Sequence, residues 1–209
     1  MWSGRRIDRW ISSIPSRKRG EVLYTRKICF SGGDFHELQE VFAHVPGVVE
    51  TRTGYINGEK EAAYTDVATG KVAALMGVEV TYNPKKMDIS KLLDILFAVV
   101  NPYVPDGQGK ARGPMYRAGV FYTSAEDEPQ IQLHLNFIAN RGKAPAVGNA
   151  QLTVNDPNSN PQLARKLYAL AEKLQSFQPA EEDRQDYLSR NPDTPTYIDF
   201  AKLWEYVKF

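Results

Sequence analysis

The pattern of apolar and polar positions from residue 22 onward predicts strands and helices in alternation. Residues 22–30 and 72–84 are rich in β-branched and aromatic side chains, which favour strands. Apolar residues recur at helical spacing in the stretch 34–45, at Phe35, Leu38, Val41 and Phe42. The Ser-Gly-Gly run at 31–33 separates the first strand from this helix, so the turn delivers Asp34 to the start of the helix.

The same pattern continues to the end of the chain. It predicts extended segments at 46–55 and 115–123, helices at 88–102, 124–140 and 162–177, and a glycine-rich loop at 104–114. The last residues, 180–209, are expected to begin helical and end in mixed structure. Two strand–helix–strand units predict an α+β fold, in which a mixed sheet with a βαββαβ (ferredoxin-like) core carries flanking helices. A single domain over 22–209 accommodates all of these elements.

Charge and cysteine content exclude several classes of function. The chain has 26 basic and 25 acidic residues and a net charge of +1, so its charge does not indicate nucleic acid binding. A single cysteine excludes an internal disulfide framework and a zinc site built on paired cysteines. The apolar run at 92–100 is interrupted by Asp94 and is too short to cross a bilayer. We therefore expect a cytoplasmic protein that binds neither nucleic acid nor membrane.

Residues 1–21 differ in composition from the rest. They are rich in arginine and serine and poor in acids. We interpret them as a solvated basic tail ahead of the domain, while an organellar leader is the alternative interpretation of the same composition.

Asp34 is the first candidate for chemistry. Glu37 follows it three residues later, which is the capping-box pattern and requires no function. In the functional interpretation Asp34 is a general base, His36 its acid–base partner, and Tyr55 and Tyr116 are hydrogen-bond donors. No third ligand accompanies Asp34 and His36, so we expect no metal, and no cofactor motif occurs.

Several short strings together resemble one family, the A-type peptide methionine sulfoxide reductases. The string "GDFHE" at 33–37 lies in register with the family's Gly-Cys-Phe-Trp-Gly turn, "PGV" at 46–48 and "GY" at 54–55 follow without a gap, and "QGKARGPMYRAGVFY" continues the match at 108–122. The resemblance covers most of 24–192. It implies the family's α+β fold and the activity of a peptide-methionine (S)-S-oxide reductase.

The same register implies that the family's polar catalytic residues are replaced. Asp34 stands at the position of the nucleophilic cysteine, Met76 at that of the catalytic glutamate, and Ala111 at that of the oxygen-binding aspartate. His36 stands at the position of the tryptophan that encloses the substrate methyl group. Phe35, Tyr55 and Tyr116 match the family's pocket. We expect Phe35, Met76 and Ala111 to line the substrate.

Three hypotheses follow for function. The favoured one is a repurposed non-redox enzyme that acts on a small molecule in the retained aromatic pocket, through Asp34 and His36. The second is a non-catalytic module that binds a thioether, a sulfoxide or a methionine-containing peptide. The third is a divergent reductase that uses Cys29.

Cys29 itself is predicted to be a buried residue. Using it as the nucleophile requires a five-residue insertion in the helix that follows, and period-two placement puts it in the middle of a strand. A free cysteine there is typically a small core residue with a raised pKa. The pattern gives no information on substrate identity or oligomeric state.

Overall fold

The computed structural model of the chain describes residues 24–58, 61–140 and 166–206. The strands are β1 (Arg26–Ser31), β2 (Val48–Ile56), β3 (Leu75–Tyr82), β4 (Gly119–Tyr122), β5 (Leu170–Lys173) and β6 (Phe177–Pro179). The helices are α2 (Phe35–Ala43), α3 (Tyr64–Ala68), α4 (Ile89–Val99), α5 (Glu128–Ala139), α6 (Tyr187–Arg190) and α7 (Phe200–Tyr206), with 3-10 turns η1 (Pro114–Tyr116), η2 (Ala125–Asp127) and η4 (Glu182–Arg184). The predicted basic tail at 1–21 lies outside the described residues.

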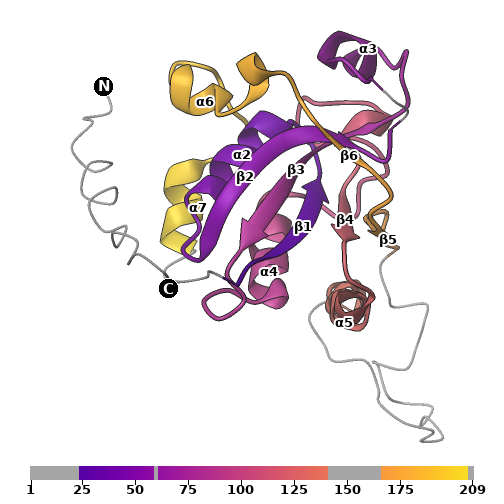
Figure 1. The fold of residues 1–209 in the computed structure, drawn as a ribbon, viewed down its shortest axis with the longest axis vertical. Helices are drawn as coiled ribbons and strands as arrows, with labels where there is room; N and C mark the ends of the chain where they lie inside the picture. Colours follow the sequence, from indigo (N-terminus) through magenta and orange to yellow (C-terminus); the bar gives the residue numbers. More distant parts are fainter. Residues whose placement is uncertain (1–23, 59–60, 141–165, 207–209) are drawn as a thin grey trace, which may run out of the picture.

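The six strands form one mixed sheet in the order β5-β4-β1-β3-β2-β6 (Figure 1). The pairs β1–β3, β1–β4, β2–β3 and β2–β6 are antiparallel, and β4–β5 is parallel. β1 and β3, which fall in the strands predicted at 22–30 and 72–84, both lie in the interior of the sheet. The α+β class with a mixed sheet and flanking helices is thereby confirmed, with α3 inserted between β2 and β3.

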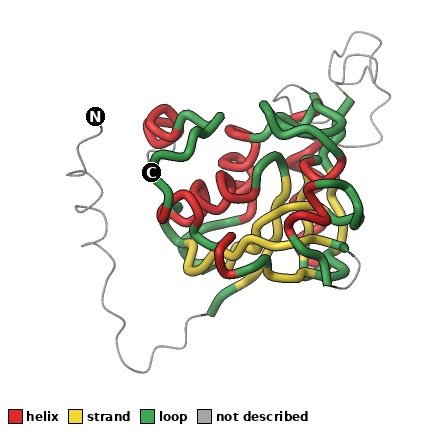
Figure 2. Tube along the Cα trace, turned by 90° about the horizontal axis from the view of Figure 1, so that it is seen from above, coloured by secondary structure: helices red, strands yellow, loops and turns green. Residues whose placement is uncertain are grey.

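One face of the sheet carries the main core. Side chains alternate along β1, so that Ile28 and Phe30 point to this face and join the apolar sides of α2 and α4. The Phe30 and Phe42 rings stack with centroids 4.8 Å apart. Figure 2 shows the strands gathered in a layer beside the helices. Asp88 caps α4 by accepting a hydrogen bond from the Lys91 amide.

On the other face of the sheet, residues 170–177 pack over a second cluster, and they belong to the segment that the sequence pattern predicts as a helix at 162–177. From residue 166 this segment instead contains the strands β5 and β6, so the helix prediction is wrong there. Leu170, Leu174 and Phe177 recur at helical spacing, but in the structure they pack against a second buried cluster of Cys29, Ile56 and Phe121. The hydrogen bonds of β5 to β4 and of β6 to β2 join residues far apart in the sequence, which a local pattern does not report.

Among the described residues, no helix is long and apolar enough to cross a membrane.

Candidate functional site

The turn between β1 and α2 presents Asp34 at the N-cap of a nine-residue helix. The Asp34 backbone is extended, with φ −72° and ψ 123°, and its Oδ1 accepts a hydrogen bond of 2.8 Å from the His36 amide. A carboxylate at this position is favoured by the partial positive charge of the helix N-terminus. The predicted cap is confirmed. The capping box is not formed as predicted, because Glu37 turns to the backbone of Tyr197 instead and its Oε1 accepts the Tyr197 N–H at 3.1 Å.

Asp34 and His36 form a close carboxylate–imidazole pair. His36 Nδ1 lies 2.8 Å from Asp34 Oδ1, and since a carboxylate only accepts hydrogen bonds, Nδ1 carries the proton. The Asp34 side chain is 40% exposed whereas that of His36 is 6% exposed. His36 Nε2 is buried and has no hydrogen-bond partner among the described residues. The carboxylate of Asp34 is therefore exposed to solvent, whereas its imidazole partner is buried.

Aromatic rings pack around this pair. The His36 ring centroid lies 4.6 Å from that of Tyr187 and 6.0 Å from that of Tyr64. Phe35 is fully buried and lies 4.6 Å from His36 and 5.9 Å from Tyr64. These short separations mean that the predicted substrate-lining ring of Phe35 is covered by the protein's own side chains.

Tyr55 is buried beneath these rings and already has a partner. Its hydroxyl donates a hydrogen bond of 2.6 Å to Glu181 Oε2, while the Tyr64 amide donates to Glu181 Oε1 at 2.8 Å. Burial is the main cause that raises the pKa of the Tyr55 hydroxyl, and the Glu181 carboxylate raises it further. The guanidinium of Arg184 stacks over the Tyr64 ring at 4.1 Å. The predicted donor Tyr55 thus bonds to Glu181.

Tyr116 is partly exposed and senses the charge of Asp34. Its carbonyl accepts the Gly33 amide at 2.9 Å, which ties η1 to the turn that carries Asp34. Burial raises the pKa of the Tyr116 hydroxyl, and the nearby Tyr64 and the charge of Asp34 raise it further. Of the four predicted catalytic residues, Asp34 and Tyr116 are the two that are not buried.

Met76 and Ala111 occupy different environments. Met76 is buried on β3 directly opposite Tyr55 of β2. Ala111 is partly exposed, and its carbonyl accepts the amide of Gln108 at 2.8 Å. Neither side chain brings an acid or a hydrogen-bonding group to the site.

The sequence pattern missed four contributors: Tyr64, Glu181, Arg184 and Tyr187. They come from the short helix α3 and from residues 181–187, which are far from Asp34 in sequence. The resemblance to the family covers the strings "YTDV" at 64–67 and the acidic stretch 180–192, but no motif in them indicated that these four side chains meet Asp34 and His36.

Cys29 lies in the middle of β1, is fully buried, and packs with Ile56 and Phe121 on the face of the sheet opposite α2. Burial is the main cause that raises the pKa of its thiol, and the charge of Glu79 adds to it while Lys27 opposes it. A thiol of this kind is a poor nucleophile because the thiolate is the reactive form. The prediction that Cys29 is a core residue is confirmed.

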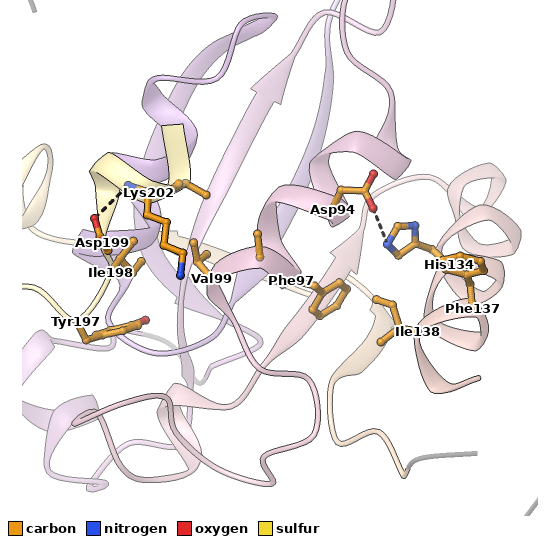
Figure 3. Close-up of a pocket in the computed structure, with 12 residues that line it drawn as sticks. Asp94, Phe97, Val99, His134, Phe137, Ile138, Tyr197, Ile198, Asp199 and Lys202 are labelled. Atoms are coloured by element: carbon orange, nitrogen blue, oxygen red, sulfur yellow. Dashed lines mark hydrogen bonds and ion pairs between the residues drawn. The ribbon is translucent and has the colours of Figure 1, made fainter. Parts of the chain in front are cut away.

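A hollow of about 510 Å³ lies to one side of the turn, between α4, α5 and the start of α7 (Figure 3). Its walls are apolar around Phe97 and Ile138, and the His134–Asp94 ion pair closes one end. A second hollow of about 410 Å³ also includes Tyr197 in its wall. Asp34 lines neither hollow. Among the described residues, no cluster of three or more His, Cys, Asp or Glu side chains is placed to hold a metal.

Comparison with known proteins supplies the family. A family model for peptide methionine sulfoxide reductase matches residues 26–208. The peptide methionine sulfoxide reductase MsrA of Mycoplasma genitalium is 30% identical over 176 residues, which cover 84% of this chain and 99% of the relative. A second relative, MsrA 2 of Mesorhizobium japonicum, is 34% identical over 178 residues, covering 83% and 82%.

Solved structures of the family have the same fold. Methionine sulfoxide reductase A of Corynebacterium diphtheriae superposes with a TM-score of 0.68 at 21% identity, covering 88% of this chain and 83% of that one. Reduced Mxr1 of Saccharomyces cerevisiae superposes with a TM-score of 0.68 at 23% identity, covering 84% and 91%. With the family match across nearly all of the described residues, the chain belongs to the peptide methionine sulfoxide reductase family.

Proposed function

We propose that this member of the family does not reduce sulfoxides through a thiol, and that Asp34 and His36 act as an acid–base dyad on a small molecule or a methionine-containing ligand. The observation that carries the proposal is the 2.8 Å contact of Asp34 Oδ1 with His36 Nδ1, in which the carboxylate remains 40% exposed. Asp34 takes a proton from the ligand on its exposed side. His36 orients the carboxylate and stabilises its charge, and Tyr116 donates to negative charge that develops on the ligand.

The absence of an accessible thiol supports the non-redox part of the proposal. In the register of the family, Asp34 stands where the nucleophilic cysteine is expected. Reduction by attack on sulfur requires a thiolate, and the buried thiol of Cys29 faces the side of the sheet away from α2. A reductase built on Cys29 is for that reason not our proposal.

One observation favours a second candidate, a module that binds a thioether or sulfoxide without converting it. His36 Nε2 is buried and the rings of Phe35, Tyr64 and Tyr187 lie against the dyad, so a proton relay through His36 to a ligand needs rearrangement of these rings. A binding module requires only the exposed carboxylate of Asp34 and the partly exposed ring of Tyr116.

The test uses the full chain with N-acetylmethionine and N-acetylmethionine sulfoxide as probes, alongside the Asp34→Asn and Cys29→Ser variants. We expect no dithiothreitol-dependent sulfoxide reduction by any of the three proteins. We expect chemical shift changes at His36 when a probe binds, and, with a reactive ligand of the same class, a loss of turnover of roughly 100-fold or more in Asp34→Asn. The free energy of unfolding of Asp34→Asn should differ from that of the wild type by less than about 0.5 kcal/mol, since asparagine caps a helix as well as aspartate does.

The outcomes separate the hypotheses. Sulfoxide reduction that disappears in Cys29→Ser would contradict the proposal and restore thiol chemistry. Probe binding that is equally tight in wild type and Asp34→Asn, with no product formed, would establish the binding module instead.

A further inference from the structure

The residues that follow α6 return across the start of α2. We call residues 194–204 the C-terminal segment. Tyr197 inserts its ring between Gly33 and Gly109, so that a Cβ atom added to Gly109 would lie 3.1 Å from the ring. Ile198 and Leu203 are buried behind it, and the Trp204 ring lies 5.8 Å from that of His44 at the end of α2. The segment thus contacts α2 near its own start, through Tyr197 and Glu37, and the C-terminal end of α2 at its own end, through Trp204 and His44.

Glu37 is the side chain of α2 that holds this segment by a hydrogen bond. Its Oε1 accepts the Tyr197 N–H at 3.1 Å. The carboxyl group is 6% exposed, and its second oxygen, Oε2, is buried without a hydrogen-bond partner among the described residues. A buried carboxylate with one unsatisfied oxygen is costly when charged, so docking of the segment over Glu37 is more favourable when Glu37 is neutral.

We propose that the C-terminal segment is a releasable cover over the Gly33–Asp34 turn, latched by Glu37. Release withdraws Tyr197 from Gly33 and so exposes more of the turn, whose Asp34 carboxylate is already 40% exposed while the segment is docked. It also removes Tyr197, Ile198 and Leu203 from the wall of the hollow in Figure 3. The inference does not rest on the proposed function, because it concerns when the turn is accessible rather than what Asp34 does.

The groups around Glu37 determine the direction of the response to pH. Burial raises the pKa of Glu37 from 4.5 to about 7, and the charge of Asp34 adds to this while the amides of Tyr197 and Ile198 oppose it. The facing hydroxyl of Tyr197 has a pKa raised by its own burial and does not titrate near neutrality. A carboxyl group with a raised pKa in the docked state favours docking at low pH, and this advantage falls as pH rises through 4.5 to 7.

Hydrogen exchange of the full chain tests the latch. After correction for intrinsic exchange, we expect the protection of amides in the C-terminal segment to fall about tenfold between about pH 6 and pH 8 in the wild type. In Glu37→Gln, the amide oxygen still accepts the Tyr197 N–H but no charge forms, so protection should stay within about twofold over the same range. Amides of β1 and β3 serve as the internal reference.

Two control variants test whether titration of a group other than Glu37 causes the fall in protection. His44→Gln removes the imidazole beside Trp204 and should retain the tenfold fall, and Glu126→Gln removes an exposed carboxylate on another element and should retain it too. A wild type with equal protection at both pH values, or a Glu37→Gln variant that falls as the wild type does, would overturn the latch. A ¹³C titration of the Glu37 carboxyl group in the wild type provides a check without substitution: a midpoint near the ordinary 4.5 rather than about 7 contradicts it.

Discussion

Gly33→Ala is expected to lower the free energy of unfolding by about 3 kcal/mol, one of the two largest effects that we predict. Gly33 has φ +81°, in the left-handed region that favours glycine. A Cβ atom there would overlap the Tyr197 hydroxyl and lie 2.9 Å from Gln108 Cβ. Gln108 is buried and Tyr197 is partly buried, so the cost is strain in the turn together with displacement of the C-terminal segment.

Gly70→Ala is the matched control. Gly70 has φ +74°, and the nearest atom to an added Cβ is Met115 Cε at 3.9 Å. It should therefore lose only the backbone term of about 1 kcal/mol. Tyr197→Phe removes the overlapping oxygen and should recover about 1 kcal/mol or more of the Gly33→Ala cost in a double-mutant cycle. Denaturant unfolding of the wild type, the three single variants and the Gly33→Ala/Tyr197→Phe double variant provides the measurement. Equal costs for Gly33→Ala and Gly70→Ala would mean that Tyr197 does not rest on the turn.

Cys29 is expected to resist thiol reagents in the folded protein by roughly 1,000-fold or more relative to the denatured chain, because labelling requires opening of β1. The side chain is fully buried between the sheet and the residues 170–177, and burial raises the pKa of its thiol. The measurement is the rate of labelling by a chromogenic disulfide with and without denaturant. One thiol per chain should react promptly only when the protein is unfolded.

Asp34→Cys in a Cys29→Ser background provides the contrast. It places a thiol at the N-cap of α2, where the helix N-terminus lowers the pKa of a cysteine, so we expect rapid labelling of the folded protein. Sulfoxide reduction should still be absent, since Met76 and Ala111 supply no acid to the site. Fast native labelling of Cys29 in the wild type would contradict its assignment as a core residue and reopen it as a nucleophile.

Local patterns in the sequence determined most of the strands and helices, the turn before α2 and the burial of Cys29. Apolar spacing located β1, α2, β3, α4 and α5. The Gly-Gly-Asp order located the turn and its cap, because those residues are chosen by the backbone conformation at their own positions. Period two along β1 was enough to bury Cys29, since adjacent side chains of a strand point to opposite faces. The ungapped spacing of short motifs was sufficient to predict the family, which the family match confirms.

Only the tertiary structure decided what surrounds Asp34. Glu37 bonds to Tyr197 rather than closing a capping box, and Tyr55 bonds to Glu181, because these partners arrive from more than a hundred residues away. The same reason explains the wrong helix prediction from residue 166 to residue 177. Leu170, Leu174 and Phe177 satisfy a helical period, but hydrogen bonds to the edges of β4 and β2 and burial against the cluster around Cys29 stabilise strands there. Hydrogen bonds and burial between distant segments outweigh local spacing, and they are absent from any window of the sequence.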